Sequence, residues 1–498
     1  MFLFMIFALG CHHSTGLKNI EPFTECPTVS SYNGQLNETL EQLYSGQNDT
    51  DTGVLMLEEG MHALLLRGWL AEQSTQSIDI QYFIFSADNV GLLSTSALLA
   101  AAQRGVRIRL LVDDVLAHGD EFMLRDLHSH PNISVKVFNP NINIGKTLTE
   151  KSKNVVTQFE DINQRMHHKT FIVDGSVVVT GGRNVGDEYY DLDDEYNFRD
   201  RDVALFGGAV ESVQESFELF WKDEHSVGIH ALLPSVTLEK AEQTWMDLRN
   251  YSCDPGNFQP MFRTLIDDMP SQLLQQKESG QLHWVNSVQY ISDAPWKNET
   301  SGLGGGSITT RELLGLLSVA TTRIWIQTPY LVLSEVGLSG LQAAIDKGVE
   351  VKILTNSLAA TDNYPAFAGF KKVRNTLTEM GVEVYEMKPN APDVQAMNRT
   401  QIPTKMDADV GLHAKSMIID EDISVVGTFN MDPRSANLNT ESFVVIRDVQ
   451  VTKEMAEYFE REMNADNAWP TSPQVDKEAG LKRRILTWLS AIVPSALL

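Results

Sequence analysis

The chain has 498 residues, of which 42% are apolar and 21% are charged, so it is globular rather than disordered and long enough for two or more domains. Its formal charge of −26 counts against a nonspecific nucleic-acid binder, because such proteins draw most of their affinity from neutralised phosphates. The three cysteines form no CxxC pair and no Cys/His cluster with zinc spacing, so no structural metal is expected.

The first 11 residues form an apolar run that ends at Cys11. The run is too short to cross a bilayer, which takes about 20 residues, but it is long enough for the core of a signal peptide. Ala8-Leu9-Gly10-Cys11 is similar to a bacterial lipobox, although no Lys or Arg precedes it. Residues 1–11 therefore predict a bacterial envelope protein that is lipid-anchored through Cys11 and faces the periplasm; the alternative is a buried apolar N-terminus. In that oxidising compartment Cys26 and Cys253 could pair.

Residues 30–225 are predicted to form a first domain of alternating helices and strands. Sequence periodicity indicates, in chain order, a helix at 61–72, a strand at 77–84, a helix at 92–103, a strand at 106–112 and a pair of strands at 170–173 and 177–180. The order strand, helix, strand argues for a parallel α/β sheet.

The first of the paired strands follows the tripeptide His167-His168-Lys169. Alternation along a strand puts His167 and Lys169 on one face and His168 on the other, so His167 is the reactive candidate. Asp174 ends this strand and is expected to begin a turn, a position for which Asp is well suited. Asn184 follows ten residues later.

Residues 226–305 contain no clear counterpart of these signals. Their end, at residues 298–307, is rich in Gly and Ser, which is typical of a flexible connection. The segment is expected to link two halves of the chain and could cover a cleft between them.

Residues 306–480 repeat the first domain. The corresponding predicted helices lie at 311–321 and 338–347, and the strands at 323–330, 349–355, 416–419 and 424–426. The motif residues recur at a constant spacing, since 413 − 167 and 430 − 184 both equal 246, and the repeated residues are His413, Lys415, Asp420 and Asn430. The same spacing joins Gln81 to Gln327, which indicates that whole domains are duplicated. Asp420, like Asp174, is expected to begin a turn.

The duplicated motif supplies the groups that cleavage of a phosphodiester needs. Lys169 and Lys415 would neutralise phosphate oxygens as point charges, and Asn184 and Asn430 would donate amide hydrogens to them. One histidine can attack phosphorus, while the other protonates the leaving alcohol and then deprotonates the acceptor. This chemistry needs neither a metal nor a cofactor, and the two copies alone do not distinguish the roles of the histidines.

A nucleophilic histidine needs its second nitrogen held, usually by a carboxylate. Asp200 lies 33 residues after His167, with Asp202 as an alternative, and Glu441 lies 28 residues after His413. Each half is therefore expected to orient its own histidine.

The tail, residues 481–498, begins with a basic cluster, Lys482-Arg483-Arg484, and continues with apolar residues. It is too short to span a bilayer but suits an interfacial helix on an anionic membrane surface. A helix docked on its own domain fits the same pattern.

With these motifs the chain resembles the phospholipase D superfamily, whose hallmark is a pair of HKD motifs, and within it the bacterial cardiolipin synthases of the C type. The resemblance covers nearly the whole chain, with supporting segments at 77–85, 105–114, 165–189, 353–363 and 411–441. It implies two similar phospholipase D-like α/β/α sandwich domains that share one active site at their interface. It also implies phospholipid substrates, with phosphatidylglycerol as the acceptor and phosphatidylglycerol or phosphatidylethanolamine as the donor.

The resemblance further implies a phosphatidyl-histidine intermediate, with His167 as the nucleophile and His413 as the acid and base. Three alternatives stay open. A phospholipase D that hydrolyses phospholipids to phosphatidic acid would use the same site. A nuclease of the same superfamily is disfavoured by the acidic composition, and an envelope protein that only binds its ligand is disfavoured by the intact histidines.

Overall fold

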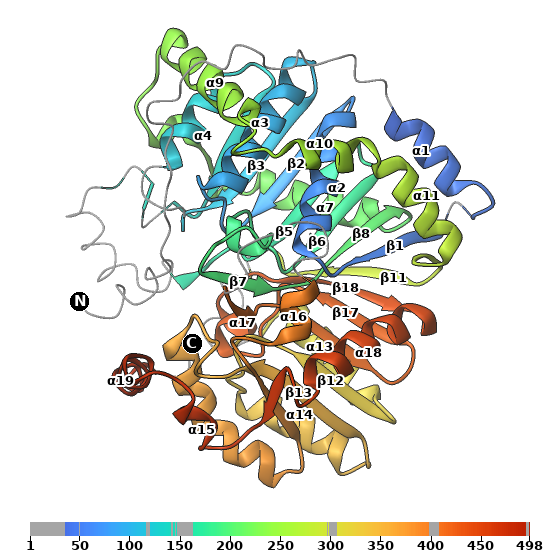
Figure 1. The fold of residues 1–498 in the computed structure, drawn as a ribbon, viewed down its shortest axis with the longest axis vertical. Coiled ribbons are helices and arrows are strands. Elements are labelled where there is room, and N and C mark those ends of the chain that lie inside the picture. The colour runs from blue at the N-terminus through green and yellow to red at the C-terminus, as the bar shows by residue number, and fades with distance from the viewer. Residues whose placement is uncertain are drawn as a thin grey trace.

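The computed structural model describes residues 35–48, 50–115, 120–140, 143–144, 146, 163–295, 297, 306–397, 408–494 and 498. Cys11, Cys26 and most of the Gly/Ser-rich connection lie outside these residues, so what the sequence suggests for them stays a prediction. The molecule consists of two halves, each built on one β-sheet, and the halves meet across the centre of Figure 1.

The first half contributes a nine-stranded sheet within the described residues. In sheet order its strands are β10 (Leu282–Val285), β1 (Thr52–Leu57), β8 (Asp202–Gly207), β6 (Val177–Gly181), β5 (Lys169–Val173), β2 (Ser77–Tyr82), β3 (Arg107–Asp113), β4 (Ile133–Phe138) and β9 (Ser226–Gly228). Most of the central strands are rich in Val, Ile and Leu, as expected of strands that are covered on both faces.

The second half repeats this strand order in an eight-stranded sheet. Its strands are β11 (Val288–Ser292), β18 (Ser442–Arg447), β17 (Ile423–Gly427), β16 (Lys415–Ile419), β12 (Arg323–Gln327), β13 (Glu350–Asn356), β14 (Glu383–Met387) and β19 (Ala468–Pro470). The strand β11 lies beside β18 as β1 lies beside β8. The second sheet therefore begins before residue 306, where the sequence pattern places the start of the second domain.

The prediction of parallel sheets holds only for three strands in each half. The strands β2, β3 and β4 run parallel, as do β12, β13 and β14, because helices cross over between them. These helices are α3 (Asn89–Gln103), α4 (Asp120–His128), α14 (Glu335–Ile345) and α15 (Tyr364–Glu379). The remaining described pairings within the two sheets are antiparallel, because hairpins such as β5–β6 and β16–β17 reverse the chain. Both sheets are mixed.

One apolar layer is shared by the two halves. It lies between the sheets and holds α7 (Val210–Lys222) and α18 (Val449–Met463), with Phe217 and Phe459 packed among side chains of both sheets. The outer face of the first sheet is covered by α2 (Gly60–Gln73), α3 and α4, and that of the second by α13 (Ile308–Val319), α14 and α15 (Figure 1). The halves are joined by a core rather than by a linker alone.

The segment 226–305 forms ordered elements that the sequence pattern did not indicate. After α8 (Ile229–Leu232), helix α9 (Leu238–Cys253) packs on α3 and α4, while α10 (Pro260–Asp267) and α11 (Met269–Ser279) pack on α2 and α1 (Gln35–Tyr44). These helices thicken the outer layer of the first half and do not lie over the interface (Figure 1). The strands β10 and β11 then carry the chain from one sheet to the other.

Two parallel pairings connect the halves directly. The strands β7 (Tyr196–Arg199) and β15 (Asp409–Leu412) form a two-stranded sheet in which Arg199 lies opposite Leu412. A second bridge pairs Met166 with Thr440. Each pairing ends one residue before a candidate histidine and one residue before a candidate carboxylate.

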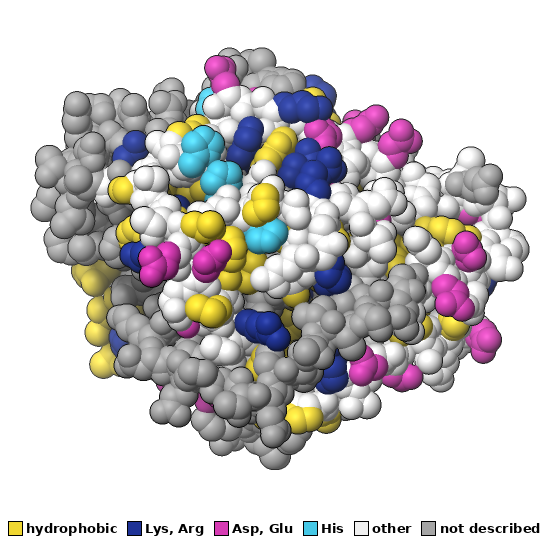
Figure 2. Space-filling model, turned by 90° about the horizontal axis from the view of Figure 1, so that it is seen from above, with side chains coloured by type: hydrophobic (Ala, Val, Ile, Leu, Met, Phe, Trp, Pro, Cys, Tyr) yellow, Lys and Arg dark blue, Asp and Glu magenta, His cyan; other side chains and the backbone are white. Residues whose placement is uncertain are grey.

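The remaining described helices are short or terminal. They are η1 (Asp187–Tyr189), α16 (Pro392–Met397), α17 (Pro433–Asn437), η3 (Val475–Lys477) and α19 (Leu481–Ser490), and α19 packs on α15. Within the described ranges, no helix combines the length and the apolar character that crossing a bilayer would take. Seen from above, the outer face of the first half intersperses basic, acidic, histidine and apolar side chains (Figure 2).

Candidate active site

The two motif histidines lie at the interface of the halves, each two residues before the lysine that begins a central strand. His167 precedes β5 and His413 precedes β16, and their exposed fractions are 7% and 5%. Strand alternation turns Lys169 to the same side as His167 and sends His168 the other way. His168 lies in the central layer, with its Nε2 3.0 Å from the Ser292 hydroxyl and its ring centroid 4.6 Å from that of Phe220.

Each histidine is held by a carboxylate from the opposite half. Nδ1 of His167 lies 2.8 Å from Oε2 of Glu441, and Nδ1 of His413 lies 2.5 Å from Oδ2 of Asp200. The expectation that each half orients its own histidine is therefore wrong. The cause is the pair of parallel bridges between the halves. Because Leu412 pairs with Arg199, the residues that follow them, His413 and Asp200, become neighbours. The pairing of Met166 with Thr440 likewise brings His167 to Glu441.

Backbone hydrogen bonds fix this crossed arrangement. The amide of His167 donates to the carbonyl of Thr440 at 3.0 Å, and that of His413 donates to the carbonyl of Arg199 at 2.8 Å. Asp202, the alternative partner for His167, instead forms a 2.8 Å ion pair with Arg67.

The contacts at Nδ1 leave Nε2 as the reactive nitrogen of each histidine. A carboxylate is an acceptor only, so the nitrogen facing it carries the proton. Aromatic rings stand against both imidazoles. Phe83 contacts His167 edge-on with a centroid distance of 4.9 Å, and Phe198 and Tyr189 contact His413 at 4.7 and 5.2 Å. These walls restrict the rings and keep water from their faces.

The two lysines are buried cations next to the histidines. Nζ of Lys169 donates to the carbonyl of His167 at 2.7 Å, and Nζ of Lys415 donates to the carbonyl of His413 and lies 2.8 Å from its Nδ1. Burial and the charge of Lys415 lower the pKa of Lys169 to about 7, and burial lowers that of Lys415 to about 8. Buried cations that are costly to keep charged are stabilised when an anion binds beside them.

The histidines are held neutral by their surroundings. Burial and the two lysine charges keep the pKa of His167 well below its ordinary value, and burial and Lys415 lower that of His413 to about 3. The carboxylates differ from each other. Burial opposes ionisation of Asp200, but the hydrogen bond from His413 and the charge of Lys415 outweigh it and hold the Asp200 pKa below its usual range, whereas burial raises the pKa of Glu441.

The two asparagines are not equivalent. Oδ1 of Asn184 accepts a hydrogen bond from the amide of Ile84 at 3.1 Å, and its Nδ2 donates to the hydroxyl of Tyr189 at 2.9 Å. The buried Oδ1 of Asn430 has no hydrogen-bond partner among the residues that the structure describes. The position that matches Tyr189 in the second half is Ser435, since 189 + 246 = 435, and its hydroxyl accepts from the amide of Asn430 at 3.2 Å.

Tyr189 is therefore a site residue that the sequence pattern did not single out. It joins Asn184 to His413 through its hydroxyl and its ring. The break in the repeat at this position is the one signal that could have pointed to it, because a tyrosine in one half stands where the other half has serine.

The motif aspartates lie outside the site. Asp174 and Asp420 follow β5 and β16 at turns, with φ of 50° and 51°. The carboxylate of Asp174 accepts hydrogen bonds from the amides of Thr75, Gln76 and Ser77, and Asp420 accepts from the corresponding amides of residues 321–323. Both carboxylates clamp the chain where it enters a central strand.

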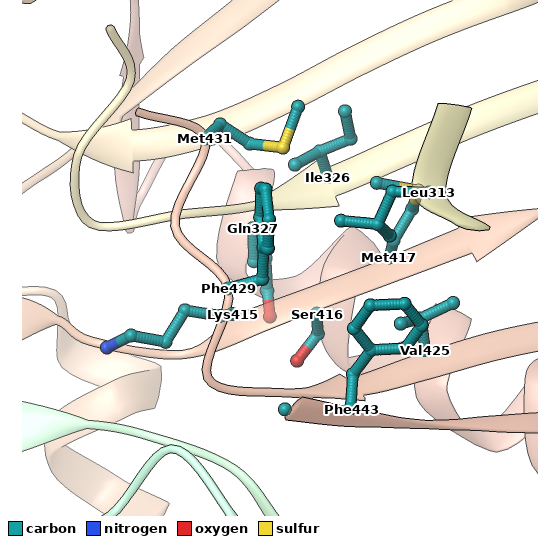
Figure 3. Close-up of a pocket in the computed structure, with 11 residues that line it drawn as sticks. Leu313, Ile326, Gln327, Lys415, Ser416, Met417, Val425, Phe429, Met431 and Phe443 are labelled. Carbon is teal, nitrogen blue, oxygen red and sulfur yellow. The ribbon is translucent and has the colours of Figure 1, made fainter. Parts of the chain in front are cut away.

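A small cavity lies behind Lys415 in the second half (Figure 3). Its volume is about 20 Å³, which is room for about one water. Leu313, Met417 and Phe443 give it an apolar lining, and the Lys415 ammonium points away from them (Figure 3). The cavity is a packing defect of the outer core and not part of the cluster around the histidines.

Both halves of the chain are similar to known proteins. The family model described as "Cardiolipin synthase, PLD-like domain" matches residues 70–221 and 313–463, so each matched segment contains one motif. Cardiolipin synthase C of Escherichia coli (strain K12) is 35% identical over 409 residues, which cover 80% of this chain and 82% of that protein. A protein of Helicobacter pylori (strain ATCC 700392 / 26695), named "Uncharacterized protein", is 31% identical over 460 residues, covering 91% and 87%.

The fold is similar to that in the crystal structure of phosphatidylserine synthase from Haemophilus influenzae Rd KW20. The TM-score is 0.59 with 13% sequence identity, and the match covers 93% of this chain and all of that one, at 100%. At this identity the similarity concerns the fold alone.

Proposed function

The chain belongs to the cardiolipin synthase family of phospholipase D-like proteins, and from that premise we propose that it transfers a phosphatidyl group to phosphatidylglycerol through a covalent intermediate on His167. The enzyme class, a phospholipase D-type phosphatidyltransferase, follows from the family. The acceptor and the covalent step are the proposal. The observation that carries it is the crossed pair of His–carboxylate contacts, which engages Nδ1 of each imidazole and leaves the reaction to Nε2 within one buried cluster of cations.

In the first step, the Nε2 lone pair of His167 attacks phosphorus of the donor lipid and the bond from phosphorus to the headgroup oxygen breaks. A proton moves from Nε2 of His413 to that oxygen. Lys169 and Lys415, with an amide hydrogen from Asn430, would stabilise the phosphoryl oxygens, and preorganised donors of this kind are often the largest catalytic contribution. The phosphodiester charge offsets the lysines, so its arrival raises the pKa of His413 and lets it hold the proton that it donates.

In the second step, neutral His413 takes the proton of the acceptor hydroxyl at Nε2. The acceptor oxygen bonds to phosphorus and the nitrogen–phosphorus bond of His167 breaks. With phosphatidylglycerol as the acceptor the product is cardiolipin. The family resemblance suggests phosphatidylglycerol or phosphatidylethanolamine as the donor, and both contain the phosphodiester on which this step acts.

The electrostatic difference between the halves supports His167 as the nucleophile. Asp200 stays ionised beside His413, and an imidazole that must gain and lose a proton is served by an adjacent negative charge. The pKa of Glu441 is raised by burial, so the carboxyl group beside His167 ionises less readily than Asp200 does. His167 therefore has less negative charge beside it and stays neutral more readily. A neutral imidazole is the form that attacks phosphorus.

Burial of both histidines favours transfer over hydrolysis. With 7% and 5% of their surfaces exposed, the imidazoles offer water little access to the intermediate. Hydrolysis to phosphatidic acid would use the same site with water as the acceptor. The net charge of −26 and the mixed surface of Figure 2 count against a nucleic-acid substrate.

We place the enzyme at the bacterial membrane, lipid-anchored through Cys11 and facing the periplasm. The lipobox-like start of the sequence supports the anchor. Cys253, at the end of α9, is disulfide-bonded, which fits an oxidising compartment. Pairing with Cys26 is the proposed arrangement.

The proposal is tested by expressing the chain in a bacterium that lacks cardiolipin and analysing its lipids. We expect cardiolipin to appear with the wild-type chain and not with His167→Ala. A rise of phosphatidic acid without cardiolipin would replace transfer by hydrolysis. Labelled donor lipid assigns the roles: label that stays covalently bound to His167→Ala would overturn the choice of nucleophile.

A further inference from the structure

Helix α19 buries polar side chains and exposes its large apolar ones. The face that packs toward α15 carries Thr487 and Ser490, which are 2% and 3% exposed. The large apolar side chains point to solvent, with Trp488 75% exposed and Ile492 80% exposed, and they continue along one side through Leu481, Ile485 and Leu489. A helix docked for its own stability buries its apolar face, so a second surface is expected to cover this one.

Cations flank the apolar stripe. Lys482 and Arg484 are exposed at the start of the helix, in a chain whose overall charge is −26. A positive cluster that interrupts a strongly acidic surface is suited to a dense negative surface. Anionic lipid headgroups provide such a surface, and each Lys or Arg near it strengthens binding. A tryptophan beside such cations is typical of a segment at the level of the headgroups.

The helix is coupled to segments that border the catalytic cluster. The Arg483 guanidinium donates to the carbonyl of Thr361 at 2.7 Å. The neighbouring Asp362 acts electrostatically on Lys415. Beyond the helix, Leu498 packs with Val332 in one apolar cluster and its carbonyl accepts from the amide of Arg434 at 2.8 Å.

We infer that α19 lies in the surface of an anionic phospholipid membrane, with Trp488, Ile485, Leu489 and Ile492 among the acyl chains and Lys482 and Arg484 at the headgroups. This surface, which we call the α19 face, would bring the loop at residue 361 and helix α17 to the bilayer, so that a lipid can reach the cluster without crossing water. The inference rests on the proposed function only for its lipid substrate.

The test measures binding of the full-length protein to vesicles by sedimentation, in a Cys11→Ser background so that an acyl chain cannot replace the helix. We expect Trp488→Glu to weaken binding about tenfold or more, because the large apolar side chain that would move from water into lipid is lost. Lys482→Gln combined with Arg484→Gln should weaken binding about 30-fold on vesicles that contain phosphatidylglycerol, and leave binding to pure phosphatidylcholine unchanged. Leu238→Glu, at an exposed apolar position on α9, is the control and should bind as the parent does.

A second readout separates this inference from the proposed function. Phosphatidyl transfer to substrates in detergent micelles should proceed at the parent rate in Trp488→Glu, because the α19 face is not in the catalytic cluster. Unchanged vesicle binding by Trp488→Glu overturns the inference. A change of Trp488→Glu from dimer to monomer, with vesicle binding intact, overturns it in favour of a second copy of the chain. If the parent protein shows no transfer in micelles but Trp488→Glu still loses vesicle binding, the proposed function is refuted and the inference about the α19 face is supported.

Discussion

Glu441 of the second half holds His167 of the first, with Oε2 2.8 Å from Nδ1 of the imidazole. The relationship is mirrored by Asp200 and His413 at 2.5 Å. Neither half therefore contains a complete site, because each supplies an imidazole to one pair and a carboxylate to the other. Activity requires the two halves in register, and the shared apolar layer fixes that register.

The crossed contacts predict which variant blocks which step. With a phosphatidyl ester of p-nitrophenol, the leaving group needs no proton, so only His167 is needed for the first turnover. Glu441→Gln should lower the rate constant of the p-nitrophenol burst by about 10²–10⁴-fold, as expected when an imidazole loses its orienting carboxylate. Asp200→Asn should retain the burst and slow the turnovers that follow, because His413 then activates the acceptor poorly. Rapid-quench kinetics measure both.

The control for this experiment is Asp202→Asn. Asp202 pairs with Arg67 and not with a histidine, so this variant should lose stability and keep the ratio of burst to turnover. The opposite pattern, with Asp200→Asn losing the burst and Glu441→Gln keeping it, would overturn either the crossed contacts or the choice of His167 as the nucleophile.

Much of the fold could be predicted from periodicity, and the exceptions have a common cause. The strands β2, β3, β5 and β6, the helices α2 and α3, and their counterparts in the second half fall where the pattern places them, because local alternation and helical spacing report burial. The antiparallel edges, β11 in the second sheet and the β7–β15 pairing depend on partners far away in the chain. Such pairings leave no local signal.

The motif residues were evident from the sequence, but their partners were not. Spacing of 33 and 28 residues linked each carboxylate to the histidine of its own half, and chain distance carries no information about which half folds against which. The role of Tyr189 was hidden for the same reason. Its importance comes from contacts with Asn184 and His413, which belong to different halves.

The lysines predict how activity depends on pH. The pKa values of Lys169 and Lys415 are about 7 and about 8, so each ammonium loses its proton as pH rises through these values. We expect kcat/KM, which reports ionisations of the free enzyme, to fall above about pH 7. Lys169→Met should lower kcat by about 10²–10³-fold, the cost of one preorganised donor, and flatten this alkaline fall. An unchanged alkaline limb in Lys169→Met would assign it to another group.

The turn aspartates are predicted to act on stability and not on catalysis. Backbone amides of residues 321–323 hold the pKa of Asp420 at about 2 despite the opposing effect of burial, and Asp174 accepts three equivalent bonds. Asp174→Ala and Asp420→Ala should each destabilise the fold by about 1–3 kcal/mol, because amides lose a charged acceptor and alanine tolerates positive φ poorly. Chemical denaturation measures the loss. Asparagine, which accepts positive φ, should recover part of it, and kcat of the folded fraction should stay at the wild-type value.

His168 predicts an acid-dependent loss of stability that is independent of the active site. Burial lowers the pKa of His168 to about 3, against an ordinary value of 6.5 in the unfolded chain. Between these values the unfolded chain binds the proton and the folded chain does not, so stability is full above about pH 6.5 and declines as pH falls toward 3. His168→Phe keeps a ring against Phe220 but cannot titrate, so its stability should decline less over this range, as measured by urea denaturation at several pH values. His62, which is partly buried and whose pKa is lowered to about 4 by desolvation, will leave part of the decline in place. The same slope in His168→Phe and the wild type would show that His168 does not contribute to the acid sensitivity of the shared core.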